Sequence, residues 1–237
     1  MEGVADAVDS LAAIKQLIYD EKKYSMKELV DALSKNFSGY DELHRDFSGC
    51  CKFGNENDSA DAIFKDITEH FSNYLLTKKT WRGGVYGAGC SPFSRAAEYG
   101  RSTGALPNGK KEDSPLFADS FGAVPGCDKN GITALLNSVL KYDHKLAKSG
   151  LVLQLKFDKN TFETPNGISS FIALAKTYMS RGGQQLSVNV VSAQDLLEAR
   201  KFPEKYKTLV VRVGGYSAYF NDLTPELQEN VIARTLL

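Results

Sequence analysis

The second half of the chain alternates between strand-forming and helix-forming segments, and this alternation limits the possible fold more than any other feature. In LVLQLKF at 151–157 the apolar residues occupy every second position, which is typical of a strand with one buried face. Thr224 followed by Pro225 marks a helix start, because threonine caps free amides and proline suits the first helical position. The other elements expected here are strands at 186–191 and 208–213 and helices at about 132–148, about 168–180 and after Ser192. The pattern predicts an α/β fold.

The first half of the chain is predominantly helical in its sequence pattern. Ser10 is a candidate cap for a first amphipathic helix, and Ser25 with Glu28 three residues later has the form of a capping box. A third helix is expected from about Asp58 to Leu76. Glycine, proline and serine are frequent between about 82 and 119, as in ordered loops. We therefore expect a mostly helical N-terminal segment ahead of the α/β part.

A pair of glycines stands out in LVVRVGGYSAYFNDL at 209–223. Gly214 and Gly215 directly follow a strongly strand-forming run. Glycine allows a positive φ and the close approach of another backbone, so the pair predicts either a turn or a tight contact. It does not form a nucleophile elbow, because Tyr219 stands where the G-x-S-x-G pattern requires its last glycine.

Composition and motif spacing exclude several other functions. Lys+Arg and Asp+Glu both number 29, so no excess of positive charge indicates a nucleic acid or an anionic membrane. The acidic N-terminus has no apolar signal core, and the longest apolar runs are too short to span a bilayer, so we expect a cytoplasmic protein. The four cysteines form no C-x-x-C pair and the three histidines lie far apart, so no metal site is predicted.

The segment RVGGYSAYF at 212–220 closely resembles the R-V-x-G-Y motif of the glycyl radical enzymes, the family of pyruvate formate-lyase, the radical diol and choline lyases and the arylacetate decarboxylases. KFGNENDSAD, STGALPNGKK, PGCDKNGITALLNSVLKYD and GGQQLSVNVV also resemble that family, in the family's order, so that the resemblance covers almost the whole chain. By position, Gly215 would hold the radical. The motif residues around it are Arg212, Val213, Gly214, Tyr216 and Ser217.

The resemblance implies a fold and a division of the chain. Family members form a ten-stranded α/β barrel of two five-stranded half-sheets, and this chain would be its C-terminal part. Residues 1–112 would belong to the pyruvate formate-lyase-like barrel body, and residues 113–237 would form the glycyl radical domain. The family's catalytic cysteine lies on an upstream loop that has no counterpart here. Cys50 and Cys51 are interpreted as structural, because SGCCKFGNEND resembles a family segment downstream of that loop.

The resemblance also implies the chemistry of Gly215. A radical at Cα is stabilised by delocalisation into the neighbouring amide groups, which requires a planar centre that a side chain would crowd. In the family a separate activating enzyme, which uses S-adenosylmethionine and an iron–sulfur cluster, removes one Cα hydrogen. No metal or bound cofactor is expected on this chain. The valine strand before Gly215 and the final helix are suited to burying the oxygen-sensitive loop.

Three functional hypotheses follow. In the favoured one the chain is the C-terminal portion of a glycyl radical lyase or formate acetyltransferase-like enzyme of anaerobic metabolism, inactive alone. Its partners would be the activating enzyme and the missing N-terminal part with the catalytic cysteine, in a homodimer when complete. In the second, it is a complete stand-in subunit that restores an oxygen-damaged pyruvate formate-lyase (formate C-acetyltransferase). In the third, it is a non-catalytic scaffold of the same fold.

Overall fold

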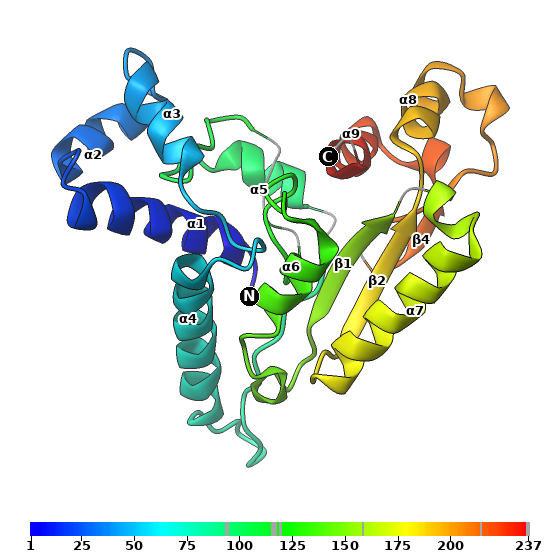
Figure 1. Ribbon diagram of the computed structural model, residues 1–237, viewed down its shortest axis with the longest axis horizontal. Helices are drawn as coiled ribbons and strands as arrows, with labels where there is room; N and C mark the ends of the chain where they lie inside the picture. The colour runs from blue at the N-terminus through cyan, green and yellow to red at the C-terminus, as the bar shows by residue number, and fades with distance from the viewer. Residues whose placement is uncertain (93–94, 115–117, 119, 158, 214, 236–237) are drawn as a thin grey trace.

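The computed structural model describes residues 1–92, 95–114, 118, 120–157, 159–213 and 215–235 (Figure 1). The helices in the first half are α1 (Val4–Ile14, continued by a π-helical turn at Lys15–Asp20), α2 (Met26–Ser34), α3 (Asp41–Gly49), α4 (Asp58–Leu76) and α5 (Ala96–Ser102). The second half contains α6 (Gly131–Val139), β1 (Val152–Phe157), α7 (Pro165–Ser180), β2 (Gln185–Val190), α8 (Ala193–Lys201), β3 (Val210–Arg212), β4 (Ser217–Tyr219) and α9 (Pro225–Thr235). Helices α1 to α4 lie on one side of the molecule, and β3, β4, α8 and α9 lie on the other (Figure 1).

Two small sheets are present in the described part of the chain. Strands β1 and β2 are parallel, in a register that runs from Val152 opposite Gln185 to Phe157 opposite Val190, and α7 connects them. Strands β3 and β4 are antiparallel and form a hairpin. The expected α/β pattern is therefore present, while barrel closure stays a prediction, because these sheets have two strands each.

The helix starts show which local signals decide a boundary. The Ser25 capping box is confirmed, since the Glu28 N–H donates to Ser25 Oγ at 3.2 Å and the Ser25 N–H donates to Glu28 Oε2 at 2.7 Å. The predicted cap at Ser10 is wrong. Helix α1 begins at Val4, and Ser10 lies inside it with a buried hydroxyl that has no hydrogen-bond partner among the described residues. Val8 is fully buried in the core, and its packing starts the helix before Ser10, the residue at which the local capping signal would start it.

Replacing Ser25 by alanine should destabilise the α2 region by about 1 kcal/mol, because the Glu28 N–H loses its acceptor and the Ser25 Oγ no longer bonds Glu28 Oε2. Urea unfolding monitored by circular dichroism measures the change. Ser38→Ala, at an exposed position after the same helix, is the control and should change the free energy of unfolding by less than about 0.5 kcal/mol. Equal effects from the two substitutions would contradict the capping argument.

The helix expected at 132–148 is shorter than predicted. Helix α6 ends at Val139, and a 3₁₀ turn follows at His144–Leu146, opened by Asp143, whose Oδ1 accepts from the Lys145 N–H at 3.0 Å. The side chain of Tyr142 is buried and its hydroxyl bonds Ser72 Oγ at 2.7 Å. Burial of this tyrosine against α4 and the aspartate cap therefore end the regular helix early.

Three separate clusters form the interior. The largest contains Phe53, Phe64, Phe121, Leu151 and Leu153 and joins α1, α4, α6 and the β1–β2 sheet. A second cluster lies among the N-terminal helices. The third is made by Val191, Leu196, Ala199, Val211, Val213, Phe220, Val231 and Ile232, and we call it the C-terminal core. The hairpin thus shares its buried side chains with α8 and α9 rather than with β1.

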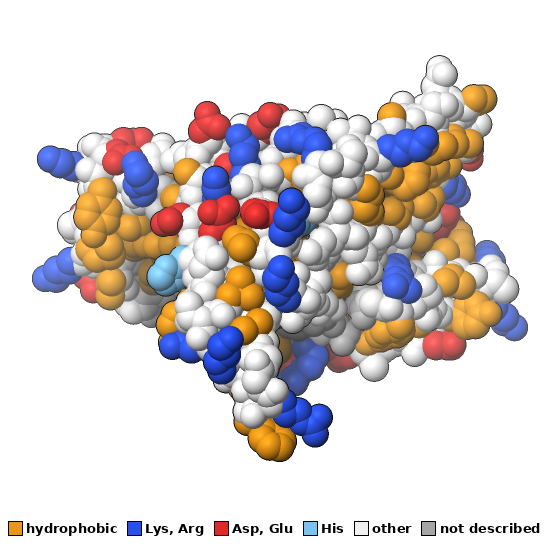
Figure 2. Space-filling model, turned by 90° about the horizontal axis from the view of Figure 1, so that it is seen from below, with side chains coloured by type: hydrophobic (Ala, Val, Ile, Leu, Met, Phe, Trp, Pro, Cys, Tyr) orange, Lys and Arg blue, Asp and Glu red, His pale blue; other side chains and the backbone are white. Residues whose placement is uncertain are grey.

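Part of the surface is apolar. Ile168, Ile172 and Met179 on α7 are each more than 40% exposed, and Figure 2 shows hydrophobic side chains gathered over the region that α7 occupies, at the right of the view. None of the helices in the described ranges is long and apolar enough to cross a membrane.

Candidate functional site

The candidate site is the turn that joins β3 to β4. The Val213 N–H donates to the Tyr216 carbonyl at 2.9 Å, which closes a two-residue turn. Gly215 occupies the second position of this turn with φ +82°, a conformation that side-chain-bearing residues rarely adopt. Gly214, the other predicted turn residue, lies outside the described residues. The turn predicted from the glycine pair is therefore present at Gly215.

Gly215 lies at the exposed tip of the hairpin. A Cβ built on it would meet none of the described atoms within 4 Å, so no tight contact explains the glycine. The described residues leave this loop exposed, so the valine strand and the final helix do not provide the burial expected of them. Val211 and Val213 are each 1% exposed and bury the base of the hairpin in the C-terminal core, whereas Gly215 and Tyr216 above them are exposed. Strand alternation explains the burial of Val211 and Val213, because only the inward-facing residues of the hairpin reach the core.

The other motif residues surround the turn without forming a catalytic constellation. Arg212 and Ser217 are paired across the hairpin, and the Arg212 guanidinium donates to Ser217 Oγ at 3.4 Å. Tyr216 is 46% exposed at the tip. The structure thus brings Arg212, Val213, Gly215, Tyr216 and Ser217 together in one hairpin, and the backbone of Gly215 is its accessible centre.

Asn189 is a contact of this hairpin that the sequence interpretation missed. Its side chain comes from β2, accepts a hydrogen bond from the Arg212 N–H at 2.8 Å and donates one to the Arg212 carbonyl at 3.0 Å. The one available signal was an amide side chain between valines in a strand segment, LSVNVV, a position that strands usually fill with apolar or β-branched residues.

The final helix that completes the C-terminal core begins as predicted. The Leu227 N–H donates to Thr224 Oγ1 at 3.4 Å, and Pro225 is the first residue of α9. Val231 and Ile232 are buried against the base of the hairpin. The turn is therefore supported from below by α9.

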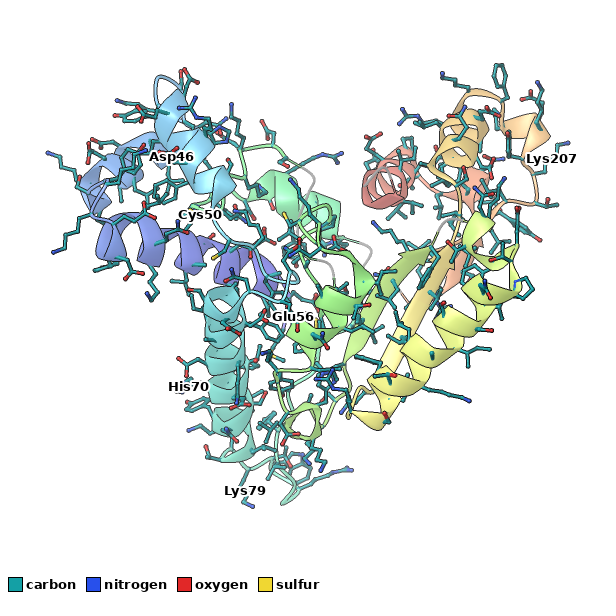
Figure 3. The ribbon with its side chains drawn as sticks, in the orientation of Figure 1. Asp46, Cys50, Glu56, His70, Lys79 and Lys207 are labelled. Carbon is teal, nitrogen blue, oxygen red and sulfur yellow. The ribbon has the colours of Figure 1, made fainter. Side chains whose placement is uncertain are left out.

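The cysteines lie away from the turn. Cys50 is at the end of α3, among the N-terminal helices and on the opposite side of the molecule from β4 (Figure 3). Burial raises the pKa of the Cys50 and Cys127 thiols to about 11, so both are protonated at neutral pH. Cys90 forms a parallel bridge with Leu151 beside β1. This placement is consistent with the interpretation of Cys50 and Cys51 as structural.

No group of three or more metal-ligating side chains occurs in the part of the chain that the structure describes. The turn itself offers an exposed glycine Cα between two peptide groups, on a hairpin with a buried base.

Comparison with known proteins assigns these segments. Residues 1–100 match the family model of pyruvate formate lyase-like proteins, and residues 117–221 match the model of the glycine radical domain. The chain is 35% identical over 241 residues to (2S)-3-sulfopropanediol dehydratase of Klebsiella oxytoca, covering 99% of this chain and 29% of that protein. It is 35% identical over 234 residues to trans-4-hydroxy-L-proline dehydratase of Clostridioides difficile, covering 98% and 29%.

A solved structure agrees with these matches. The glycerol-bound B12-independent glycerol dehydratase from Clostridium butyricum superimposes with a TM-score of 0.92 at 36% identity, over 98% of this chain and 29% of that one. The hairpin turn thus lies within a glycine radical domain. The chain belongs to the glycyl radical enzyme family. It spans less than a third of the length of these relatives.

Proposed function

We propose that Gly215 stores a glycyl radical and that the chain is the radical-carrying C-terminal portion of a lyase-type glycyl radical enzyme. The observation that carries the proposal is the position of Gly215, at φ +82° on the tip of a hairpin inside the matched glycine radical domain. In this division residues 1–112 belong to the barrel body and residues 113–237 form the radical domain.

The exposed Cα suits the removal of a hydrogen atom. A radical activating enzyme that uses S-adenosylmethionine would take one of the two Cα hydrogens of Gly215, leaving an unpaired electron that spreads over the adjacent peptide groups. Transfer to a cysteine thiol then returns a hydrogen atom to Cα and moves the unpaired electron to sulfur. In our proposal that cysteine belongs to the segment that the relatives have in addition.

The names of the relatives favour an elimination reaction. Two of them are dehydratases, and a third, 34% identical over 235 residues, is the isethionate sulfite-lyase of Bilophila wadsworthia. We therefore propose a lyase that breaks a carbon–oxygen or carbon–sulfur bond, and not a formate acetyltransferase. These relatives give no support to the stand-in and scaffold hypotheses. A homodimer of the complete enzyme remains part of the proposal.

Electron paramagnetic resonance after anaerobic activation tests the proposal. The chain is incubated with S-adenosylmethionine, a reductant and the activating enzyme of a relative. The one hydrogen left on Cα should split the radical signal into two lines, and labelling with Cα-deuterated glycine should collapse this splitting. A signal that is unchanged by the label would place the radical on another residue type, and the absence of any signal would contradict the proposed function.

A further inference from the structure

Strand β2 and the glycine hairpin lie next to each other without forming one sheet. The β1–β2 pair and the β3–β4 pair are separate in the described part of the chain. Their buried side chains are also divided, since Leu151, Leu153 and Leu155 belong to the largest core and Val211 and Val213 belong to the C-terminal core. Val191, the residue directly after β2, packs in the C-terminal core, so hydrophobic packing joins the hairpin to the end of β2. At Asn189 the contact is polar, because the backbone of Arg212 needs hydrogen-bond partners there.

Asn189 of β2 joins the two sheets through two hydrogen bonds to the backbone of β3. The residues Arg212 and Ser217 are a pair in the β3–β4 ladder, followed by the hydrogen bond between Val213 and Tyr216. Because hydrogen-bonded and non-bonded pairs alternate in an antiparallel ladder, the N–H and C=O of Arg212 point away from β4. Both groups bond the Asn189 carboxamide, at 2.8 Å and 3.0 Å.

The carboxamide matches a peptide group in both donor and acceptor, so Asn189 does for β3 what a neighbouring strand would do. Its side chain is partly buried, which shields the two bonds from competing water. The bonded residue, Arg212, is three positions before Gly215. Other contacts between the C-terminal elements and the preceding part of the chain include that of α9 with α5 and the ion pair of Lys159 with Asp195 on α8, at 3.0 Å.

We propose that Asn189 is a positioning residue for the glycine turn, which holds the hairpin against β2 through the backbone of Arg212. Both hydrogen bonds must break before the hairpin can leave β2, so Asn189 sets how often the turn is released. This role deepens the proposed function and rests on it, because the position of the turn matters to catalysis only if Gly215 carries the radical.

Asn189→Leu keeps the size of the side chain and removes both hydrogen bonds. Hydrogen exchange of the full chain should show at least about tenfold faster exchange of the Arg212 amide, as expected when two hydrogen bonds are lost. Amides of α4 and β1 serve as internal references and should not change. Gln185→Leu makes the same change at an exposed position of β2 and should leave the Arg212 amide protected.

A second variant tests whether altered packing of the leucine, and not the lost hydrogen bonds, causes the faster exchange. Asn189→Asp retains an acceptor for the Arg212 N–H and lacks the donor for its carbonyl, so it should also speed exchange at the hairpin. If neither variant alters exchange at residues 209–220, Asn189 does not position the turn and the proposal is overturned, whether or not the wild type forms a radical.

The radical gives the readout that a purely structural role would not move. Once activated, Asn189→Leu should give a glycine-derived signal whose two lines are broader than those of the wild type, because a turn that is no longer held samples more backbone orientations. A lower yield with an unchanged line width would instead indicate a loss of folded protein and would overturn the positioning role. If the variants exchange faster but the wild type shows no glycine-derived signal, Asn189 still anchors the hairpin. The function proposed for Gly215 is then refuted.

Discussion

Replacing Gly215 by alanine should abolish the glycine-derived radical signal while the chain remains folded. An alanine Cβ at this position would meet no described atom within 4 Å, so the substitution causes no steric clash. The positive φ of +82° costs an alanine about 1–2 kcal/mol, which is less than a typical free energy of unfolding. The methyl group, however, crowds the planar centre that a delocalised Cα radical needs.

Gly83 provides a matched control for this experiment. It has φ +83°, it is exposed, and a Cβ built on it also meets no described atom within 4 Å. Gly83→Ala should therefore have the same backbone cost and retain the full radical signal. Circular dichroism of both variants checks the fold. A two-line signal that persists in Gly215→Ala would place the radical on another glycine, and loss of the signal in both variants would mean that the backbone strain is responsible.

The second large effect should come from pH, through the buried side chain of Asp9 on α1. This residue is 0% exposed; its Oδ1 accepts from the Phe53 N–H at 2.7 Å, and its Oδ2 has no hydrogen-bond partner among the described residues. Burial raises the pKa of Asp9 to about 7. The positive charge of Lys52 opposes this shift and the carboxylate of Asp6 adds to it.

The sign of the effect follows from the direction of the shift. The folded-state pKa lies above the unfolded value, so the contribution of Asp9 to stability is fully present below the unfolded pKa and is lost as the pH rises through about 7. The loss amounts to about 1.4 kcal/mol per pH unit between pH 5 and 7, where the unfolded chain is ionised and the folded chain is not. Burial raises the pKa of Asp6 as well, which acts in the same direction.

Asp9→Asn isolates this contribution. Asparagine retains the acceptor for the Phe53 N–H and carries no charge, so it avoids the loss of about 4 kcal/mol that ionisation of Asp9 causes by pH 7.5. Its N–H₂ group would take the place of the unpartnered Oδ2 at a cost of about 2 kcal/mol, so the variant should be about 2 kcal/mol more stable than the wild type at pH 7.5 and lose less stability between pH 5 and 7. Urea unfolding followed by far-ultraviolet circular dichroism measures both quantities. Asp66→Asn, at an exposed position of α4, should follow the wild-type pH dependence. Parallel curves for wild type and Asp9→Asn would show that Asp9 is ionised in the folded chain.

Burial of His144 acts in the same pH range with the opposite sign. Burial lowers the pKa of its imidazole below 6.5, so the stability that neutral His144 provides is lost as the pH falls below 6.5. Just below pH 6.5 the two effects therefore oppose each other in the wild type, since a rise in pH costs stability at Asp9 and restores it at His144. Because His144 is present in wild type and Asp9→Asn alike, the difference between the two curves still reports Asp9 alone.

The sequence predicted correctly those helix starts and strands that depend on residues close together in the chain. The alternation in 151–157 predicted β1, and the Ser25 box and the Thr224–Pro225 start predicted the beginnings of α2 and α9. Tertiary packing decided the rest. Burial of Val8 lets α1 begin before Ser10. The early end of α6 depends on burial of Tyr142 against α4.

The sequence predicted the glycine of the candidate site, Gly215, but not the side chain that holds the hairpin, Asn189. The resemblance of RVGGYSAYF pointed to Gly215, and the positive φ at that residue fits the expected turn. Asn189 gave only a weak signal, an amide between valines, because its partner Arg212 is 23 positions away and is bonded through its backbone, so the residue type of the partner indicates nothing. Exposure of Gly215 also depends on what packs around the hairpin, and alternation in one strand does not determine it.

The separation of the C-terminal core from the largest core has a consequence for cooperativity. Eight buried residues hold the hairpin, α8 and α9 together, and none of them belongs to the Phe53–Phe64–Phe121 cluster. Such a unit behaves as a foldon, which opens and closes with a free energy of its own. Calorimetry of the chain should then resolve more than one transition, and substitutions inside this unit change the melting of the glycine hairpin while the midpoint of the other transition stays in place.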